Sequence, residues 1–472
     1  MLLGRRTIPD ACPVSTKAAQ QGLTRNWQVH LVTPMFGGGA VAKETGGVDI
    51  ADGDLPVRAT SIRGHLRFWW RATRGTAYGT IQELRRREVE VWGNTDTPSP
   101  VLVRVPDYQL KRPTPCAEYK RRTDQPNRFS LHWKWSPPAA LGEPLDALPY
   151  VAFPFQGKPP RGGDATPEEK PADMIPGGKF ELEIRFPLEL QQDVEAALWG
   201  WLNFGGLGAR TRRGCGSLYC KDFAPGSVEG LNDWLAESQR RYGWKLARNF
   251  GRWAMVGRGP EYKPRVQHPW TAWNEILRDY RDFRQKPGFA RNNGKGMRPG
   301  RSRYPEPEAI RNALTQRASS HQRLREIPDD GVPRAALGLP IIFHFKDSGE
   351  RPTDDPVDTM LVPLIGRDAA SALPATRMAS PLILKPLAIS PTQAVPSALI
   401  IMATGFLQGA KLVRVGEDPE STGRTFAKSD IVDARFARDS AYPNSPLDPK
   451  SGGYAVTAFL NYILTADRGY VS

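Results

Sequence analysis

Cysteine and histidine are scarce in this chain, and their scarcity excludes two kinds of site. The 472 residues include four cysteines and six histidines. Cys12, Cys116, Cys215 and Cys220 are scattered, and no two form a Cys-x-x-Cys pair, so the sequence predicts neither a disulfide framework nor a zinc motif. Carboxylates do not recur at metal-binding spacings either. We therefore expect reduced thiols, no bound metal and no cofactor.

Long apolar runs are also missing. No stretch approaches the roughly 18 apolar residues that a membrane-spanning helix requires, and residues 1–20 lack the apolar centre of a signal peptide. The sequence thus predicts a soluble, cytoplasmic protein with no membrane partner.

Two nucleotide-binding motifs are absent as well. A Walker A loop ends in Gly-Lys-Ser or Gly-Lys-Thr, and neither tripeptide occurs. A dinucleotide-binding fingerprint would need a glycine three residues after Gly208, where Thr211 stands, and its glycines would precede a helix instead of following one. These absences exclude the usual cradles for nucleoside triphosphates and dinucleotides.

Positive charge is what the sequence has in excess. Lys and Arg outnumber Asp and Glu by 65 to 50, which gives a formal net charge of +15 and a pI near 9.7. Such a balance favours a polyanionic partner, above all a nucleic acid, although surplus charge also serves solubility alone. A hydrophobic content of 39%, with 13 tryptophans, supports well-filled cores.

The stretch Trp199–Ser217, WGWLNFGGLGARTRRGCGS, is the most informative in the chain, because an apolar helical run ends there in a loop of glycines and arginines. Glycine permits positive φ and removes the Cβ atom that would hold a ligand away from main-chain N–H groups. An RNA backbone is the predicted ligand, and a turn with nothing bound is the alternative. The predicted contact residues are Gly205, Gly206, Gly208, Gly214 and Gly216 together with Arg210, Arg212 and Arg213.

The second half of this loop, Arg213–Cys220, begins like the RNP1 strand of an RNA-recognition motif. Cysteine and serine stand where that strand carries base-stacking aromatic residues. We therefore expect contact with the RNA backbone and no stacking of bases.

A helix with an arginine edge is predicted from Thr60, with Thr60 or Ser61 as its N-cap. Apolar residues recur at helical spacing, and a stripe of arginines lies beside them. The arginines predicted to bind RNA are Arg63, Arg67, Arg71 and Arg74. No acid lies within 60–80, but a solvated face paired with acids elsewhere is the alternative. His65, with no sequence neighbour to orient it, is interpreted as a packing or RNA-contact residue in preference to a general base.

The order of elements predicts an α+β fold. Periodicity indicates helices from 60 and at 190–203, and strands at 24–33, 89–92, 101–105, 179–186 and 217–223. The order strand, helix, strand, strand, helix, strand is the ferredoxin-like plan. Residues 1–225 are therefore predicted to form an N-terminal ferredoxin-like domain with an irregular insertion at 106–176.

The rest of the chain is predicted to form two further regions. Residues 226–330 are expected to be mainly helical, with a basic loop at 286–303 that orders on RNA through Arg298, Arg301 and Arg303, or that is an unbound surface loop. Residues 331–472 are predicted to form a second α+β domain, from strand-like segments at 339–345, 379–387 and 398–407 and a closing helix at 454–464.

Five segments resemble one family. They are Pro56–Ala72 (PVRATSIRGHLRFWWRA), Asn203–Leu218 (NFGGLGARTRRGCGSL), Gly300–Pro307 (GRSRYPEP), Ala336–Phe345 (ALGLPIIFHF) and Arg377–Pro386 (RMASPLILKP). Together they resemble the RAMP-superfamily subunit, numbered first in its operon nomenclature, of type III-B (Cmr-type) CRISPR effector complexes. The chain departs from that family at Cys215, where an aromatic residue is common, and in the insertion at 106–176.

The resemblance implies two ferredoxin-like (RRM-like) domains in tandem, with a helical insertion and a glycine-rich loop. It also implies antiviral defence, with partners that are guide RNA, target RNA and other RAMP subunits, and a place at the guide 3′ end. Arg63, Arg67, Arg71 and the loop residues Gly205–Gly216 would contact RNA or neighbouring subunits.

Three functions are consistent with these features. The preferred one is a non-catalytic RNA-binding subunit, in which arginines neutralise phosphates while base pairing between guide and target selects sequence. The second is a metal-independent endoribonuclease that processes guide precursors, with His65 as the candidate base. The third is a purely architectural subunit whose basic surfaces meet acidic faces of its neighbours.

Overall fold

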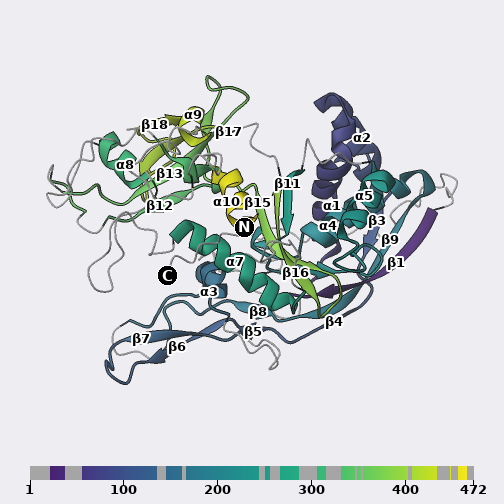
Figure 1. Ribbon diagram of the computed structural model, residues 1–472, viewed down its shortest axis with the longest axis horizontal. Helices are drawn as coiled ribbons and strands as arrows, with labels where there is room; N and C mark the ends of the chain where they lie inside the picture. The colour runs from purple at the N-terminus through teal and green to yellow at the C-terminus, as the bar shows by residue number, and fades with distance from the viewer. Residues whose placement is uncertain are drawn as a thin grey trace, which may run out of the picture.

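The computed structural model describes residues 22–37, 56–135, 145–161, 166–243, 250–255, 266–285, 304, 306–314, 331–345, 348–351, 354–401, 407–432, 447 and 455–464. Within these ranges, helices are mixed with sheets whose strands all pair antiparallel. The predicted α+β class is confirmed. Figure 1 shows one sheet with α1 and α4 at one end of the molecule, a second sheet at the other end, and α7 between them.

The first sheet has the strand order β10–β1–β9–β3, and β4 also pairs with β9. Its strands are β1 (Gly22–Leu31), β3 (Leu102–Arg104), β4 (Tyr108–Leu110), β9 (Gly178–Pro187) and β10 (Leu218–Tyr219). The helices α1 (Ala59–Thr73) and α4 (Gln191–Phe204) pack against each other and share one core with the sheet. Along the chain, β1, α1, β3, β9, α4 and β10 follow the predicted order of strands and helices.

Alternating side chains determine which face of this sheet is buried. In β1, Trp27, Val29 and Leu31 point into the core, while β9 buries every second residue from Phe180 to Phe186. The two strands pair over ten residues, from Gly22 opposite Pro187 to Leu31 opposite Gly178. The period-two patterns were therefore sufficient to predict these two strands, because each strand has an apolar face towards the core and a polar face away from it.

The strand predicted at 89–92 is wrong, because these residues end the helix α2 (Ile81–Trp92). Val89 and Val91 alternate with acids, which resembles a strand over so short a window. The helix is set by its start, where the Thr80 side chain accepts a hydrogen bond from Glu83 N while the Glu83 carboxylate accepts one from Thr80 N. This capping box gives hydrogen-bond acceptors to the main-chain N–H groups of Thr80 and Glu83, and so it fixes the start of the helix.

The insertion at 106–176 is more regular than the sequence indicated. Its β4 extends the first sheet, while β2 (Met35–Phe36), β8 (Asp173–Ile175) and β5 (Thr114–Pro115) make a small sheet of their own. A hairpin of β6 (Ala117–Arg121) and β7 (Phe129–Trp133) extends from the lower left of Figure 1. The short helix α3 (Leu148–Ala152) then packs on α7.

The C-terminal half contributes two more sheets. One has the order β11–β16–β15 and the other β12–β13–β17–β18, with β14 pairing with β13. The strands are β11 (Phe250–Met255), β12 (Ile341–Phe343), β13 (Thr359–Ile365), β14 (Leu373–Pro374), β15 (Leu382–Ala388), β16 (Ala394–Ile401), β17 (Leu407–Arg414) and β18 (Thr425–Ala427). The helices are α5 (Leu231–Tyr242), α7 (Pro269–Gln285), α8 (Glu306–Leu314), α9 (Lys428–Val432) and α10 (Ala455–Leu464).

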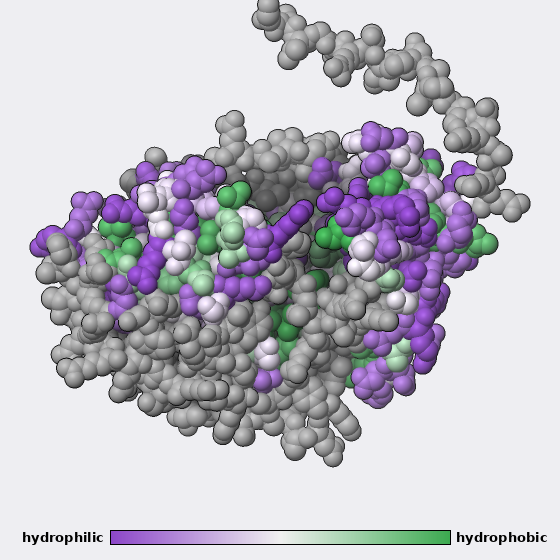
Figure 2. All heavy atoms as spheres, turned by 90° about the horizontal axis from the view of Figure 1, so that it is seen from above, coloured by the Kyte–Doolittle hydropathy of each residue, from purple (hydrophilic) through white to green (hydrophobic). Residues whose placement is uncertain are grey.

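The core of the first sheet continues into the C-terminal half. Ile383, Leu387, Val395 and Leu399, from β15 and β16, belong to the same buried cluster as the side chains of β1, β9 and α4. Of the described helices, none is long and apolar enough to cross a membrane. Figure 2 shows mostly hydrophilic side chains over the end that carries α2, with small scattered apolar groups.

Candidate nucleic-acid interface

The glycine-arginine loop is folded tightly between α4 and β10. Gly208, Gly214 and Gly216 adopt positive φ, as does Arg210 at +57°. A Cβ atom on Gly216 would lie 1.9 Å from the carbonyl oxygen of Leu207, and one on Gly208 would lie 2.3 Å from that of Phe36. Glycine is thus required at both positions by the chain's own packing as well as by backbone conformation.

Main-chain N–H groups of this loop donate within the loop and to the segment Pro34–Phe36. Gly216 N donates to Pro34 O at 2.8 Å, Ala209 N to Phe36 O at 2.7 Å, and Leu207 N to Gly216 O at 2.9 Å. Gly205, Gly206, Gly214 and Gly216 are buried. At these positions the geometry serves internal packing, and contact of the loop glycines with RNA stays a prediction.

Two loop arginines bond to β15 and to the residues just before it. Arg212 donates to Ser380 O, and Arg213 donates to Leu382 O at 3.0 Å and to the Tyr280 hydroxyl at 3.1 Å. Arg213 also lies over the Tyr280 ring, with its Cζ 4.7 Å from the centroid. These side chains therefore join the N-terminal half to α7 and to the β15–β16 sheet.

Arg210 is the most exposed of the loop arginines and stands at a basic cleft of about 610 Å³. The cleft lies between the loop, α3, the end of α7 and the segment before β12. Its lining residues are Pro149, Tyr150, Val151, Phe153, Arg210, Arg213, Arg284, Gln285, Leu337, Gly338, Leu339, Pro340, Met378 and Ser380. Three arginines and no carboxylate appear among these described residues, so the cleft is suited to an anion.

The charge of this cleft is concentrated around one tyrosine. Burial raises the pKa of Tyr280, but the positive charges of Arg213 and Arg284 outweigh burial and lower it. The pKa of Arg210 is lowered too, first by loss of water against the cleft wall and then by the charges of Arg213 and Arg377. Arg377 is exposed, so a fourth guanidinium lies near the cleft. Arg213 and Arg377 therefore repel the charge of Arg210, and an anion bound beside Arg210 would relieve that repulsion.

The arginine stripe on α1 is engaged within the chain. Arg63 donates to the carbonyls of Trp92 and Val101, while Arg67 and Arg71 both bond to Glu88 Oε1, at 2.8 and 2.6 Å. Glu88 belongs to α2, just beyond the stretch without acids. This is the paired helix face that the sequence left open as an alternative. Since Arg67 and Arg71 remain 37% and 43% exposed, RNA contact there stays a prediction.

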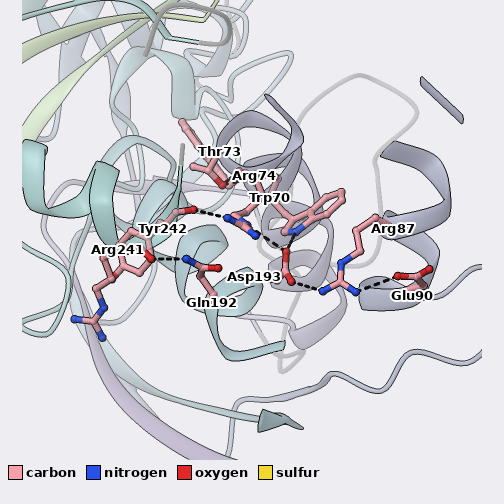
Figure 3. Close-up of polar contacts among 10 residues, drawn as sticks. Trp70, Thr73, Arg74, Arg87, Glu90, Gln192, Asp193, Arg241 and Tyr242 are labelled. Carbon is pink, nitrogen blue, oxygen red and sulfur yellow. Dashed lines mark hydrogen bonds and ion pairs between the residues drawn. The ribbon is translucent and has the colours of Figure 1, made fainter. Parts of the chain in front are cut away.

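Arg74 belongs to a buried network around Asp193, drawn in Figure 3. The carboxylate, only 3% exposed, accepts hydrogen bonds from Trp70 Nε1 at 2.7 Å, Arg87 at 2.7 Å and Arg74 at 3.4 Å. Arg74 also donates to Tyr242 O at 2.9 Å. The network links α1, α2, α4 and α5, so this arginine has a structural role.

The remaining predicted residues divide into two groups. His65 packs parallel to the Trp201 ring, at 6.2 Å between centroids and 10° between planes, and burial lowers its pKa. Arg298, Arg301 and Arg303 lie outside the described residues.

The thiols of Cys116, Cys215 and Cys220 are free and buried, and burial raises the pKa of each to about 12. In the described part of the chain, no three histidine, cysteine or carboxylate side chains gather to hold a metal ion.

Sequence reasoning missed the other walls of the basic cleft. Arg284, Tyr150 and Phe153 come from α7 and the insertion, far from the loop in sequence. The one available signal was Arg284 at the end of an amphipathic helix, next to apolar Phe283. That signal is weak, because basic residues are common at helix C-termini.

Part of the chain is similar to a known protein family. Residues 28–219, which include most of the first sheet and all of the loop Gly205–Gly216, match the model of the RAMP superfamily. This part of the chain is therefore similar to proteins of the RAMP superfamily.

Among characterised proteins, the chain is similar to the CRISPR system Cmr subunits Cmr1-2 and Cmr1-1 of Pyrococcus furiosus. The first is 25% identical over 201 residues, which are 41% of this chain and 92% of the relative. The second is 26% identical over 164 residues, 34% of this chain and 40% of the relative. The resemblance to the first Cmr-type subunit is confirmed at this level.

Two solved structures resemble the chain at low similarity. The apo crystal structure of Cmr1 from Pyrococcus furiosus is 15% identical, with 85% of this chain and 94% of that chain covered and a TM-score of 0.40. A chain of a type III-B Cmr-β complex, solved with cognate target RNA and AMPPnP in the presence of single-stranded DNA, is 12% identical, with 80% and 95% covered and a TM-score of 0.38.

Proposed function

We propose that this chain is a non-catalytic RNA-binding subunit of a type III-B, Cmr-type, RNA-guided complex that targets RNA in antiviral defence. It would contact guide RNA, target RNA and other RAMP subunits near the guide 3′ end. Similarity to Cmr1 subunits over most of the length of Cmr1-2 supports the assignment to the complex.

The basic cleft is the observation that supports RNA binding. It places Arg210, Arg213 and Arg284 around one concavity with no carboxylate among its described lining residues. Arginine in such a setting neutralises phosphates without reading sequence. Phe153, which is 64% exposed, stands at the same cleft and offers a surface to an unpaired base.

The domain organisation forms part of this proposal. Residues 1–225 would be a ferredoxin-like RAMP domain, since the strand order β10–β1–β9–β3 and the helices α1 and α4 fit that plan. Residues 331–472 would be a second domain of this type, joined by the mainly helical region 226–330.

Removing two exposed charges of the cleft should weaken RNA binding. For the double variant Arg210→Gln, Arg377→Gln, we expect affinity for several unrelated single-stranded RNAs to fall about tenfold or more at 150 mM salt. The slope of log affinity against log salt should decrease in magnitude by about 1.4, because each phosphate contact contributes about 0.7 with single strands. Fluorescence anisotropy across a salt series would measure both.

Arg240→Gln provides the matched control, because it removes one guanidinium that is 72% exposed on α5. Its affinity and salt slope should stay close to wild type. An unchanged slope in the natively folded double variant would contradict the role of the cleft. Cleavage of repeat RNA in EDTA that His65→Ala abolishes would instead overturn the non-catalytic part of the proposal.

A further inference from the structure

A second basic cavity, of about 570 Å³, lies at the opposite end of α7 from the cleft. It is bounded by the end of β1, the residues after β4, the start of β9, the start of α7 and the turn between β15 and β16. Its lining residues are His30, Leu31, Val32, Lys111, Pro176, Gly177, Gly178, Lys179, His268, Trp270 and Pro391. The two sites are separate, since α7 has 17 residues and spans about 25 Å.

We propose that this cavity binds the terminal phosphate monoester of a nucleotide, with the nucleoside against its apolar wall. Lys111 and Lys179 would supply the charge, and His268 would donate a hydrogen bond from Nε2. The proposal is independent of the arginine cleft and of its function.

The lysines carry uncompensated charge. Among the described residues, neither Lys111 nor Lys179 has an ion-pair partner, and no carboxylate lines the cavity. Glu181, two residues along β9 from Lys179, accepts a hydrogen bond from the Gln28 amide at 3.0 Å. Two ammonium groups match a terminal phosphate, whose charge is roughly −1.5 to −2 at pH 7.

Both imidazoles are oriented by hydrogen bonds on one nitrogen. Trp270 N donates to His268 Nδ1 at 3.3 Å, so the proton of the neutral ring lies on Nε2. His30 Nε2 donates to the Gln28 amide oxygen at 3.2 Å, so the proton of this neutral ring is already engaged within the chain. Burial lowers the pKa of both histidines, and the charge of Lys179 lowers that of His30 further while Glu181 opposes it. Both rings are therefore mostly neutral at pH 7 and act there as hydrogen-bonding groups.

One wall of the cavity is formed by the backbone of Gly177 and Gly178, which carry no side chains. Lys111 N donates to Gly177 O at 2.9 Å, and a Cβ atom on Gly178 would meet Gln109 O at 2.5 Å. Pro176, Pro391 and Trp270 add apolar surface around this wall. The volume lies within the range of roughly 300–1,000 Å³ of cavities that hold small ligands, and it exceeds what one acidic side chain would fill.

Isothermal titration calorimetry on the full-length protein tests this assignment. The probes are uridine 5′-monophosphate, uridine, and a short oligoribonucleotide with a 5′-phosphate, a 3′-phosphate or neither. We expect binding of the monophosphate and none of uridine. Preference for one phosphorylated oligonucleotide over the unphosphorylated one would identify an RNA end as the source, and binding of the monophosphate alone would identify a free nucleotide.

The variant Lys111→Gln, Lys179→Gln should lose at least tenfold in affinity for uridine 5′-monophosphate. The single variant Lys111→Gln should bind uridine 5′-monophosphate several-fold more weakly than wild type. Because Lys111 is exposed, this variant tests the proposal even if the double variant fails to fold. Arg210→Gln, Arg377→Gln in the arginine cleft should bind the monophosphate like wild type, which separates this test from that of RNA binding. Equal affinity in wild type and Lys111→Gln, or tighter binding of a hexa-aspartate peptide than of the nucleotide, would overturn the proposal.

Discussion

Replacing Asp193 with alanine is expected to lower the free energy of unfolding by about 3–5 kcal/mol, the usual cost of removing one partner from a buried charge network. The carboxylate accepts hydrogen bonds from Trp70, Arg74 and Arg87 and is only 3% exposed. Without it, the indole N–H is left buried without its acceptor, and Arg74, itself 18% exposed, loses its counter-charge. Urea denaturation followed by circular dichroism would measure the change.

Glu90→Ala is the matched control for Asp193→Ala. Glu90 also pairs with Arg87, at 3.0 Å, but its side chain is 50% exposed. Exposed pairs contribute about 0–1 kcal/mol, so this variant should remain near wild-type stability. Equal losses in both variants would show that burial does not determine the strength of this network.

Replacing Lys385 with methionine is expected to change how stability depends on pH. Lys385 is buried in β15, donates to Gly205 O at 2.8 Å, and has its pKa lowered by burial from 10.5 to about 7. Between pH 7 and 10.5 the unfolded chain therefore binds a proton at this amine that the folded chain has lost. Stability of the wild type then rises with pH across this window, by up to about 1.4 kcal/mol per pH unit.

The measurement is the difference in unfolding free energy between wild type and Lys385→Met at pH 7.5 and at pH 9. From pH 7.5 to pH 9, this difference should change by about 2 kcal/mol in favour of the wild type. The hydrogen bond lost in the variant adds the same offset at both pH values and does not affect the change. Other titrating groups cancel in this difference. Lys411→Met, on β17 where the amine reaches solvent and donates to Glu420 O, should show no such movement. A difference independent of pH for Lys385→Met would mean that the buried amine stays charged.

Local patterns were enough to predict much of the first sheet and its helices. Trp27, Val29 and Leu31 alternate with polar neighbours, and Val194, Leu198 and Leu202 recur at helical spacing, so β1 and α4 could be read from short windows. The same method failed at Val89 and Val91, because four residues cannot separate a strand from the last turn of a helix whose cap lies nine residues earlier.

The candidate site was predictable only in part, because its walls come from distant segments. The glycines and arginines of the loop were evident, but their partners were not. Arg213 meets Leu382 and Tyr280, and Lys385 meets Gly205, across separations of 67 to 180 residues. Nor could the sequence show that Arg67 and Arg71 pair with Glu88, since side-chain pairing across helices depends on how those helices cross.

The glycine-arginine loop is covered by residues that are translated after it, and this order has a consequence for synthesis of the protein. β15 and α7 supply Lys385, Leu382 and Trp273, whose indole donates to Arg213 O at 2.6 Å, and they follow the loop in the chain. When residues 28–219 have just left the ribosome, β15 and α7 have not yet been made. The apolar side chains that later contact Ile383 and Leu387 are then exposed to water. That segment can reach its final packing only after the later strands are translated, so expressing it alone should yield an aggregation-prone product.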